Sequence, residues 1–203
     1  MTPTYADHLS RDKRLKKLIE QQGTHTLKKR KNICNYLCAS IISQQLSTKV
    51  ADVIYSRFIG LFGGKEPAPE QILACTIETL RSAGLSNAKA TYVQHVARFQ
   101  LEKGMDARKL QAMTNEEVIS YLTEIKGVGR WTVEMLLMFA LGREDVFAVD
   151  DLGIQNAMAA IYKIDKEDKK FLKQEMLRIS AKWSPYRTYA CIHLWRWKDN
   201  SPE

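Results

Sequence analysis

The segment EEVISYLTEIKGVGRWTVEMLLMFALG, residues 116–142, decides the fold. Its two halves show the apolar spacing of helices, and the four residues between them, 126–129, include two glycines. Glycine adopts the positive φ angles that a tight turn needs and leaves the neighbouring amides uncovered. The pattern therefore predicts two helices joined by a short glycine turn, with the second helix beginning directly after Gly129.

This predicted turn is a candidate site for an anion. The first N–H groups of a helix lack intrahelical partners and carry partial positive charge, so they attract phosphate. Lys126 and Arg130 flank these amides and add charge, and the apolar Ile125 is expected to anchor the turn in the core. An ordinary helical hairpin explains the same residues, and they do not by themselves separate the two interpretations.

The composition favours a polyanionic partner and an intracellular location. The net charge is +8 and the pI is about 9.3, and basic side chains near phosphates release condensed counterions. Hydrophobic residues make up 45% of the chain, enough for a buried core. The N-terminus lacks the apolar stretch of a signal peptide, and we see no run long enough to span a membrane. The four cysteines lack the spacing of a metal or iron–sulfur site, so we expect reduced thiols.

The remaining sequence is helical in pattern, and no long alternating segment indicates a strand. A capping box is expected at Thr114 and Glu117, and Thr76 is expected to cap another helix. The predicted fold class is all-α, with about ten short helices. The principal helices are expected at residues 8–22, 32–42, 48–62, 77–84, 86–102 and 116–125.

Two adjacent acidic residues, Asp150 and Asp151, precede the helical run LGIQNAMAAIY. One aspartate at a helix start is explained by capping of the free amides. The second can project into an apolar-walled cavity, where a carboxylate stabilises developing positive charge. Capping alone remains an alternative interpretation of this pair.

Taken together, GVGRWTVEML at 127–136 and VFAVDDLGIQ at 146–155 resemble the hairpin, loop and aspartate signature of the helix-hairpin-helix DNA glycosylases. The 3-methyladenine DNA glycosylase II branch is the most similar, and the resemblance covers roughly residues 30–198. Ala-Val replaces the Pro or Gly that often precedes the aspartate pair, and Lys126 stands where the turn often has Pro. The supporting segments are SIISQQLSTKVA at 40–51, KGVGRWT at 126–132 and WSPYRTYACIHLWRW at 183–197.

The resemblance implies a two-lobed helical bundle with an active-site cleft between the lobes, in the compact form of the family. The whole chain, 1–203, is then one glycosylase domain. Residues of about 30–45 and 145–203, with the N-terminal segment, are expected in one lobe. Residues of about 46–144 are expected to form a six-helix lobe that carries the hairpin at 115–140.

The resemblance also implies the chemistry. Asp151 matches the catalytic carboxylate, and Asp150 is expected to cap the helix or support the site. Alkylated purines are cationic leaving groups, and a carboxylate stabilises the oxocarbenium-like transition state that forms when they depart. Lyase-type members carry a nucleophilic lysine where this chain has Trp131, so a monofunctional hydrolase is expected. Two alternatives are a non-catalytic hairpin DNA-binding module and a glycosylase of other base specificity.

The implied ligand is double-stranded DNA with an extruded alkylated base. Electron-rich rings suit a cationic base, although core packing explains the same aromatic residues. Gln45, with Leu46 as second choice, is expected to fill the gap in the duplex, although a polar turn explains this segment too. The expected pocket residues are Trp131, Trp195, Tyr186 and Tyr36. The expected DNA-binding residues are Gln44, Gln45, Leu46, Lys126, Gly127, Val128, Gly129, Arg130 and Thr132.

No cofactor is expected to be required, but the resemblance implies a structural Na⁺ or K⁺ at the hairpin. Its ligands would be the backbone carbonyls of Thr123, Ile125 and Val128. Arg187 is expected to give structural support by pairing with a carboxylate or with the loop, and His193 to be a hydrogen-bonded core residue. We expect a monomer, located in the cytoplasm of a bacterium or the nucleus of a eukaryote.

Overall fold

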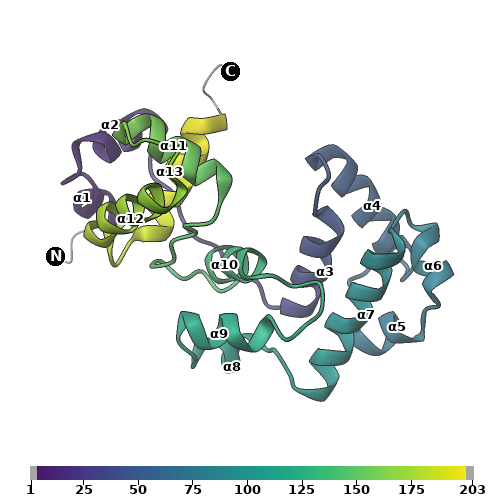
Figure 1. The fold of residues 1–203 in the computed structure, drawn as a ribbon. Coiled ribbons are helices and arrows are strands. Elements are labelled where there is room, and N and C mark those ends of the chain that lie inside the picture. The colour runs from purple at the N-terminus through teal and green to yellow at the C-terminus, as the bar shows by residue number, and fades with distance from the viewer. Residues whose placement is uncertain (1–3, 200–203) are drawn as a thin grey trace. The chain divides into compact units, whose positions relative to one another are not determined.

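The computed structural model describes residues 4–199 (Figure 1). These residues form thirteen α-helices and one 3₁₀-helix, and none of them lies in a β-strand, so the predicted all-α class is confirmed. None of the helices in this part of the chain has the length and apolarity of a membrane span. The four cysteines are free thiols, and Cys34, Cys38 and Cys191 are buried.

The chain divides into two compact units. We call residues 29–141 the central unit and the described residues on either side of it the terminal unit. The predicted lobe boundary differs from this division, because residues 30–45 lie in the central unit. The reason is packing: the helix in this segment contacts three other helices of the central unit and shares their core.

The central unit is organised around its longest helix, α7, which packs against α3, α5 and α6. Ser86 caps its first turn, and a stripe of apolar residues from Ala90 to Phe99 is buried. Its helices are α3 (Ile33–Ser43), α4 (Thr48–Gly60), α5 (Pro69–Ala74), α6 (Ile77–Ser82), α7 (Asn87–Glu102), α8 (Ala107–Gln111), α9 (Asn115–Leu122) and α10 (Arg130–Phe139).

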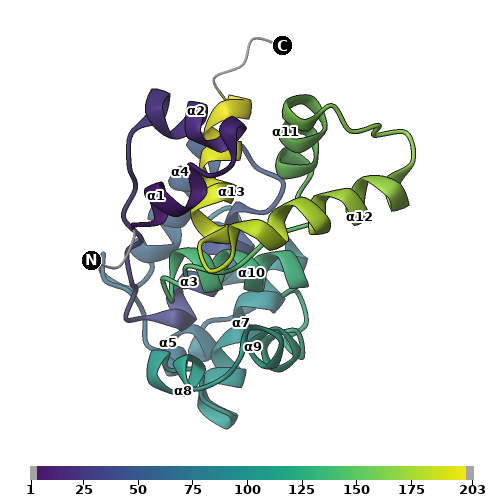
Figure 2. The ribbon, with the colours of Figure 1, turned by 90° about the vertical axis from the view of Figure 1, so that its left-hand side faces the viewer.

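The terminal unit joins both ends of the chain. Helix α13 contacts both α2 and α11, and α11 in turn contacts α12 (Figure 2). Its elements are α1 (Tyr5–Leu9), α2 (Lys13–Gln22), α11 (Leu152–Tyr162), α12 (Lys169–Ser180), the 3₁₀-helix η1 (Ala181–Trp183) and α13 (Arg187–Asp199).

Most local signals in the sequence correspond to helix ends. Thr114 and Glu117 form the predicted capping box, and Thr76 caps α6 as expected. The predicted helix at 8–22 is instead two helices, because the Asp12 side chain accepts from the amides of Arg14 and Leu15 and starts a new helix there.

Candidate active site

Asp151 is the N-cap of α11, and one of its carboxylate oxygens accepts two hydrogen bonds. The Ile154 amide donates to Oδ1 at 2.8 Å, and the Trp195 indole Nε1 donates to the same atom at 2.9 Å. The residue is only 9% exposed. Two donors from α11 and α13 therefore orient this carboxylate within the terminal unit.

Gly153 allows this arrangement. A β-carbon at this position would lie 3.1 Å from Asp151 Oδ1 and 3.2 Å from Trp195 Cδ1, closer than ordinary van der Waals contact. Any side chain here would therefore crowd the hydrogen bond between the indole and the carboxylate. The glycine in Asp-Leu-Gly was a signal in the sequence that we had not interpreted.

Asp150 does not cap the helix, so that part of the prediction is wrong. The cap is the residue directly before the first helical residue, and this is Asp151. Asp150 stands one position earlier, is half-exposed and forms an ion pair with Lys173 of α12. It thereby connects the loop before α11 to α12.

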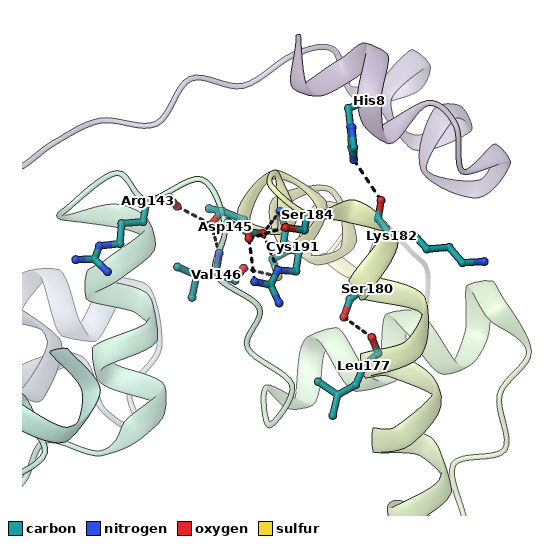
Figure 3. Close-up of polar contacts among 11 residues, drawn as sticks. His8, Arg143, Asp145, Val146, Leu177, Ser180, Lys182, Ser184 and Cys191 are labelled. Carbon is teal, nitrogen blue, oxygen red and sulfur yellow. Dashed lines mark hydrogen bonds and ion pairs between the residues drawn. The ribbon is translucent and has the colours of Figure 1, made fainter. Parts of the chain in front are cut away.

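The loop that leads to Asp151 is held by the start of α13. Arg187 donates to both carboxylate oxygens of Asp145, at 2.6 and 2.9 Å, which confirms its predicted structural pairing. Ser184 donates to Asp145 as well, and the Val146 amide donates to the Thr188 hydroxyl (Figure 3). Burial would raise the pKa of Asp145, but the hydrogen bonds from Arg187 and Ser184 outweigh it and lower that pKa.

The predicted hairpin is present in the central unit as α9, a turn and α10. The turn spans residues 123–129 and is longer than the four residues expected. The helical pattern is lost after Leu122, because the Ile125 amide donates to the Leu122 carbonyl, three residues back, at 3.1 Å. Ile125 is 3% exposed, so its predicted anchoring role is confirmed.

The two glycines of the turn differ in role. Gly127 has φ of +101°, and a β-carbon there would overlap the ring of Tyr92. Gly129 has φ of −96°, and a β-carbon there would meet nothing within 4 Å. Positive φ and close approach therefore require glycine only at Gly127, whereas Gly129 begins α10 without a side-chain cap.

The two flanking cations also differ. Lys126 is exposed, as a phosphate-binding side chain must be. Arg130 donates to both carboxylate oxygens of Glu116, at 3.0 and 2.6 Å, and to Glu134 at 3.1 Å. These two acids offset the charge that we expected Arg130 to add at the turn, and they let it connect α9 to α10.

Gln45 and Leu46 were predicted to fill the gap that the extruded base leaves in the duplex. They lie in the short connection after α3, beside the hairpin, and we call residues 44–46 the plug loop. The Gln44 side-chain Nε2 donates to the Gly127 carbonyl at 3.3 Å. Gln45 is exposed with φ of +57°, and Leu46 is half-buried. The structure thus brings the predicted plug loop, 44–46, against the glycine turn.

The hollow beside the plug loop measures about 640 Å³, within the range of roughly 300–1,000 Å³ that small-molecule pockets occupy. Its walls include Gln44, Gln45, Leu46 and the 47% exposed Trp131. All of them belong to the central unit. Two other DNA-binding candidates, Val128 of the turn and Thr132 of α10, have buried side chains, which leaves their main chain for contacts.

The predicted pocket aromatics are divided between the two units. Trp131 and Tyr36 belong to the central unit, and Trp195 and Tyr186 to the terminal unit. The Tyr36 hydroxyl donates to the Met135 carbonyl at 3.2 Å, and burial raises its pKa. The Tyr186 ring meets His8 edge-on at 5.4 Å. Tyr36 and Tyr186 thus make packing contacts in their own units, and the pocket role of all four remains a prediction.

The predicted cation ligands, Thr123, Ile125 and Val128, lie together in the turn. The Ile125 carbonyl accepts from the Val128 amide at 2.9 Å, which leaves its second lone pair for a cation. A carbonyl-rich, non-helical turn suits the hard monovalent ions that we expected. Binding of the ion remains a prediction.

The sequence did not indicate that Lys89 and Tyr92 of α7 contact the plug loop and the glycine turn. Lys89 donates to the carbonyls of Ile42 and Gln44, and Tyr92 packs on Gly127. A lysine and a tyrosine in an amphipathic helix have no local signal that distinguishes such roles from ordinary surface positions.

A glycine-turn helical hairpin, followed by a loop that ends in a buried helix-capping aspartate, defines a helical protein of the helix-hairpin-helix class. Residues 38–182 match the sequence model of the family described as HhH-GPD superfamily base excision DNA repair protein. The chain belongs to this superfamily, which confirms the predicted resemblance.

Relatives of known name agree with this assignment. DNA-3-methyladenine glycosylase 1 of Schizosaccharomyces pombe is 36% identical over 187 residues, which are 91% of this chain and 80% of the relative. The crystal structure of a Bacillus halodurans DNA-3-methyladenine glycosidase is 36% identical with a TM-score of 0.84, covering 98% of this chain and 91% of that one. The S. pombe 3-methyladenine DNA glycosylase Mag1, in complex with abasic DNA, is 32% identical with a TM-score of 0.84 and 97% coverage of both chains.

Proposed function

We propose that this protein is a monofunctional DNA glycosylase of base excision repair. It hydrolyses the N-glycosidic bond of alkylated purines, of the 3-methyladenine and 7-methylguanine type, in double-stranded DNA. The observation that carries the proposal is the oriented Asp151 carboxylate, which follows the hairpin in a chain whose relatives are named 3-methyladenine glycosylases. It acts as a monomer without a required cofactor, in the bacterial cytoplasm or a eukaryotic nucleus.

The reaction needs one carboxylate. An alkylated purine is cationic and leaves as a neutral base, so it requires no proton from the enzyme. Positive charge then develops on the deoxyribose, and Asp151 stabilises it and orients the attacking water. Ile154 and Trp195 hold Oδ1, so little reorganisation is needed when the charge appears.

No amine nucleophile stands at the lyase position of the hairpin. Trp131 occupies it, so the product is an abasic site in an intact strand. The turn amides and Lys126 bind the backbone phosphates, and Gln45 fills the space of the extruded nucleotide. Trp195, which is hydrogen-bonded to Asp151, supplies an electron-rich ring for the cationic base.

The decisive experiment incubates methylated duplex DNA with the protein and identifies the free bases by chromatography. The wild type should release 3-methyladenine and 7-methylguanine. Asp151→Asn preserves the capping oxygen but removes the charge, so release should fall at least about hundredfold while DNA binding persists. The matched control Asp150→Asn should keep nearly the wild-type rate, because its carboxylate pairs with Lys173.

Three results would contradict the proposal. Release by Asp151→Asn at the wild-type rate would remove this residue from the mechanism. A protein that binds the duplex and releases no base would be a non-catalytic hairpin module. A Schiff base trapped with borohydride in the wild type would overturn the monofunctional assignment.

A further inference from the structure

Lys89 of α7 caps the end of a different helix. Its ammonium donates to the Ile42 carbonyl at 2.8 Å and to the Gln44 carbonyl at 2.7 Å, at the C-terminal end of α3. Carbonyls at a helix C-terminus lack intrahelical partners and carry partial negative charge, so a cation there is favourable. Lys89 is half-buried, and both contacts lie within the central unit.

The residue after this cap has an unusual backbone. Gln45 has φ of +57°, a left-handed conformation that is unfavourable for a residue other than glycine. Contacts on Gln44, directly before it, hold the chain in this shape. Lys89 binds the Gln44 carbonyl, and the Gln44 side chain donates to the Gly127 carbonyl of the hairpin turn.

The same helix also holds the hairpin turn. The Tyr92 ring packs against Gly127 so closely that no β-carbon fits between them. His95 Nδ1 lies 3.4 Å from the Lys126 carbonyl. Lys89, Tyr92 and His95 follow one another at intervals of three residues, so successive turns of α7 contact first the plug loop and then the glycine turn.

We propose that Lys89 is a positioning residue for base extrusion. It holds the plug loop, 44–46, against the hairpin turn, so that Gln45 enters the duplex in a fixed register with the phosphates bound by the turn. This inference rests on the proposed glycosylase function. It adds a residue whose ammonium binds main-chain carbonyls at the end of α3 and in the plug loop.

Extrusion of a paired base costs unstacking and unpairing energy, whereas a base that is already unpaired costs less. A preordered loop loses little entropy when it inserts. When the lesion is well paired, only a small fraction of the bound duplex is extruded, so the extra ordering cost of a loose plug lowers the excision rate in full; when the lesion is already unpaired, most of it is extruded and the same cost has little effect. Loosening the plug loop should therefore slow excision of a well-paired lesion much more than excision of a lesion opposite an abasic site. We call this abasic site the gap, because the lesion has no pairing partner there.

The test compares single-turnover excision of one 7-methylguanine placed either opposite cytosine or opposite an abasic gap. Lys89→Met keeps the aliphatic stem and removes the donors. Excision opposite cytosine should fall about tenfold or more, and excision opposite the gap should change little. Lys89→Arg retains donors and should restore much of the difference. Gln44→Leu removes the contact to Gly127 and should show the same selective defect.

Arg98→Met is the matched control, because Arg98 is an exposed cation on the same helix. Its ratio of paired to unpaired excision should equal that of the wild type. Thermal melting of each variant identifies loss of folding, which lowers both rates together. An unchanged ratio in Lys89→Met and Gln44→Leu would overturn this inference while leaving the glycosylase intact. A wild type that excises neither lesion would instead contradict the proposed function.

Discussion

Asp151 Oδ1 receives hydrogen bonds from two helices, and this convergence gives the residue its orientation. A capping aspartate on an isolated helix would receive only the backbone donor. The indole of Trp195 adds a second donor, and Gly153 leaves the space in which it can approach. The hydrogen bond from Trp195 therefore orients the Asp151 carboxylate in a way that helix capping alone would not.

Trp195→Phe tests this dependence, because it keeps an aromatic ring and removes the indole N–H. A hydrogen bond to a charged group contributes about 1.5–3 kcal/mol, so single-turnover excision should fall about tenfold to hundredfold. Affinity for an undamaged duplex should stay unchanged. Trp197→Phe, two residues further along α13, serves as the control. Excision by Trp195→Phe at the wild-type rate would show that the indole does not orient Asp151.

At the scale of the element, the two basic side chains of the hairpin, Lys126 and Arg130, have different roles. Arg130 connects α9 to α10 through Glu116 and Glu134, whereas Lys126 stays exposed at the turn. Both residues add one to the net charge that suggested a nucleic-acid partner. Because Arg130 is already paired with two acids, only Lys126 is expected to displace a full counterion from DNA.

Salt titrations of DNA affinity can distinguish the two residues. Lys126→Gln should reduce the slope of log affinity against log salt by about 0.9, the value for one phosphate contact. Arg130→Gln should reduce it less. The order reverses for stability: Arg130→Gln should cost about 1–3 kcal/mol in urea unfolding, because the buried Glu134 loses a charged hydrogen-bond donor. Equal slopes for the two variants would refute the predicted difference between Lys126 and Arg130 in DNA binding.

On the scale of the whole molecule, a buried histidine couples folding to pH. His193 was expected to be a fully hydrogen-bonded core residue, and the structure satisfies only one nitrogen. Its Nδ1 donates to Gln22 at 2.8 Å, whereas its Nε2 is buried and has no partner among the described residues. Burial, followed by the nearby His25 and Arg196, lowers the pKa of His193 to about 4.

A lowered histidine pKa makes the folded state bind fewer protons than the unfolded state. The contribution of His193 is therefore complete above pH 6.5, the unfolded value, and declines as the pH falls toward 4. Between pH 7 and pH 5 the wild type should lose about 2 kcal/mol more than His193→Gln in urea unfolding. Parallel pH curves for wild type and His193→Gln would contradict this prediction.

Local signals were sufficient for much of the fold. The hairpin follows from apolar periodicity and a glycine pair, and the capping box at Thr114 from two residues in one helical turn. Signals of this kind failed where a polar side chain started a new helix, as at Asp12. They also could not show that Arg130 is matched by two acids, because Glu116 lies fourteen positions away.

By itself, the sequence determined the all-α class, the glycine-turn hairpin, and the place of Asp151 at the start of a helix, because each depends on residues within a turn or two of one another. Only the tertiary structure decided which groups orient that carboxylate and hold the plug loop. Trp195 is 44 positions from Asp151, and Lys89 is 45 from Gln44. Such contacts arise when separate helices bury their apolar faces together, and no short segment of the sequence specifies them.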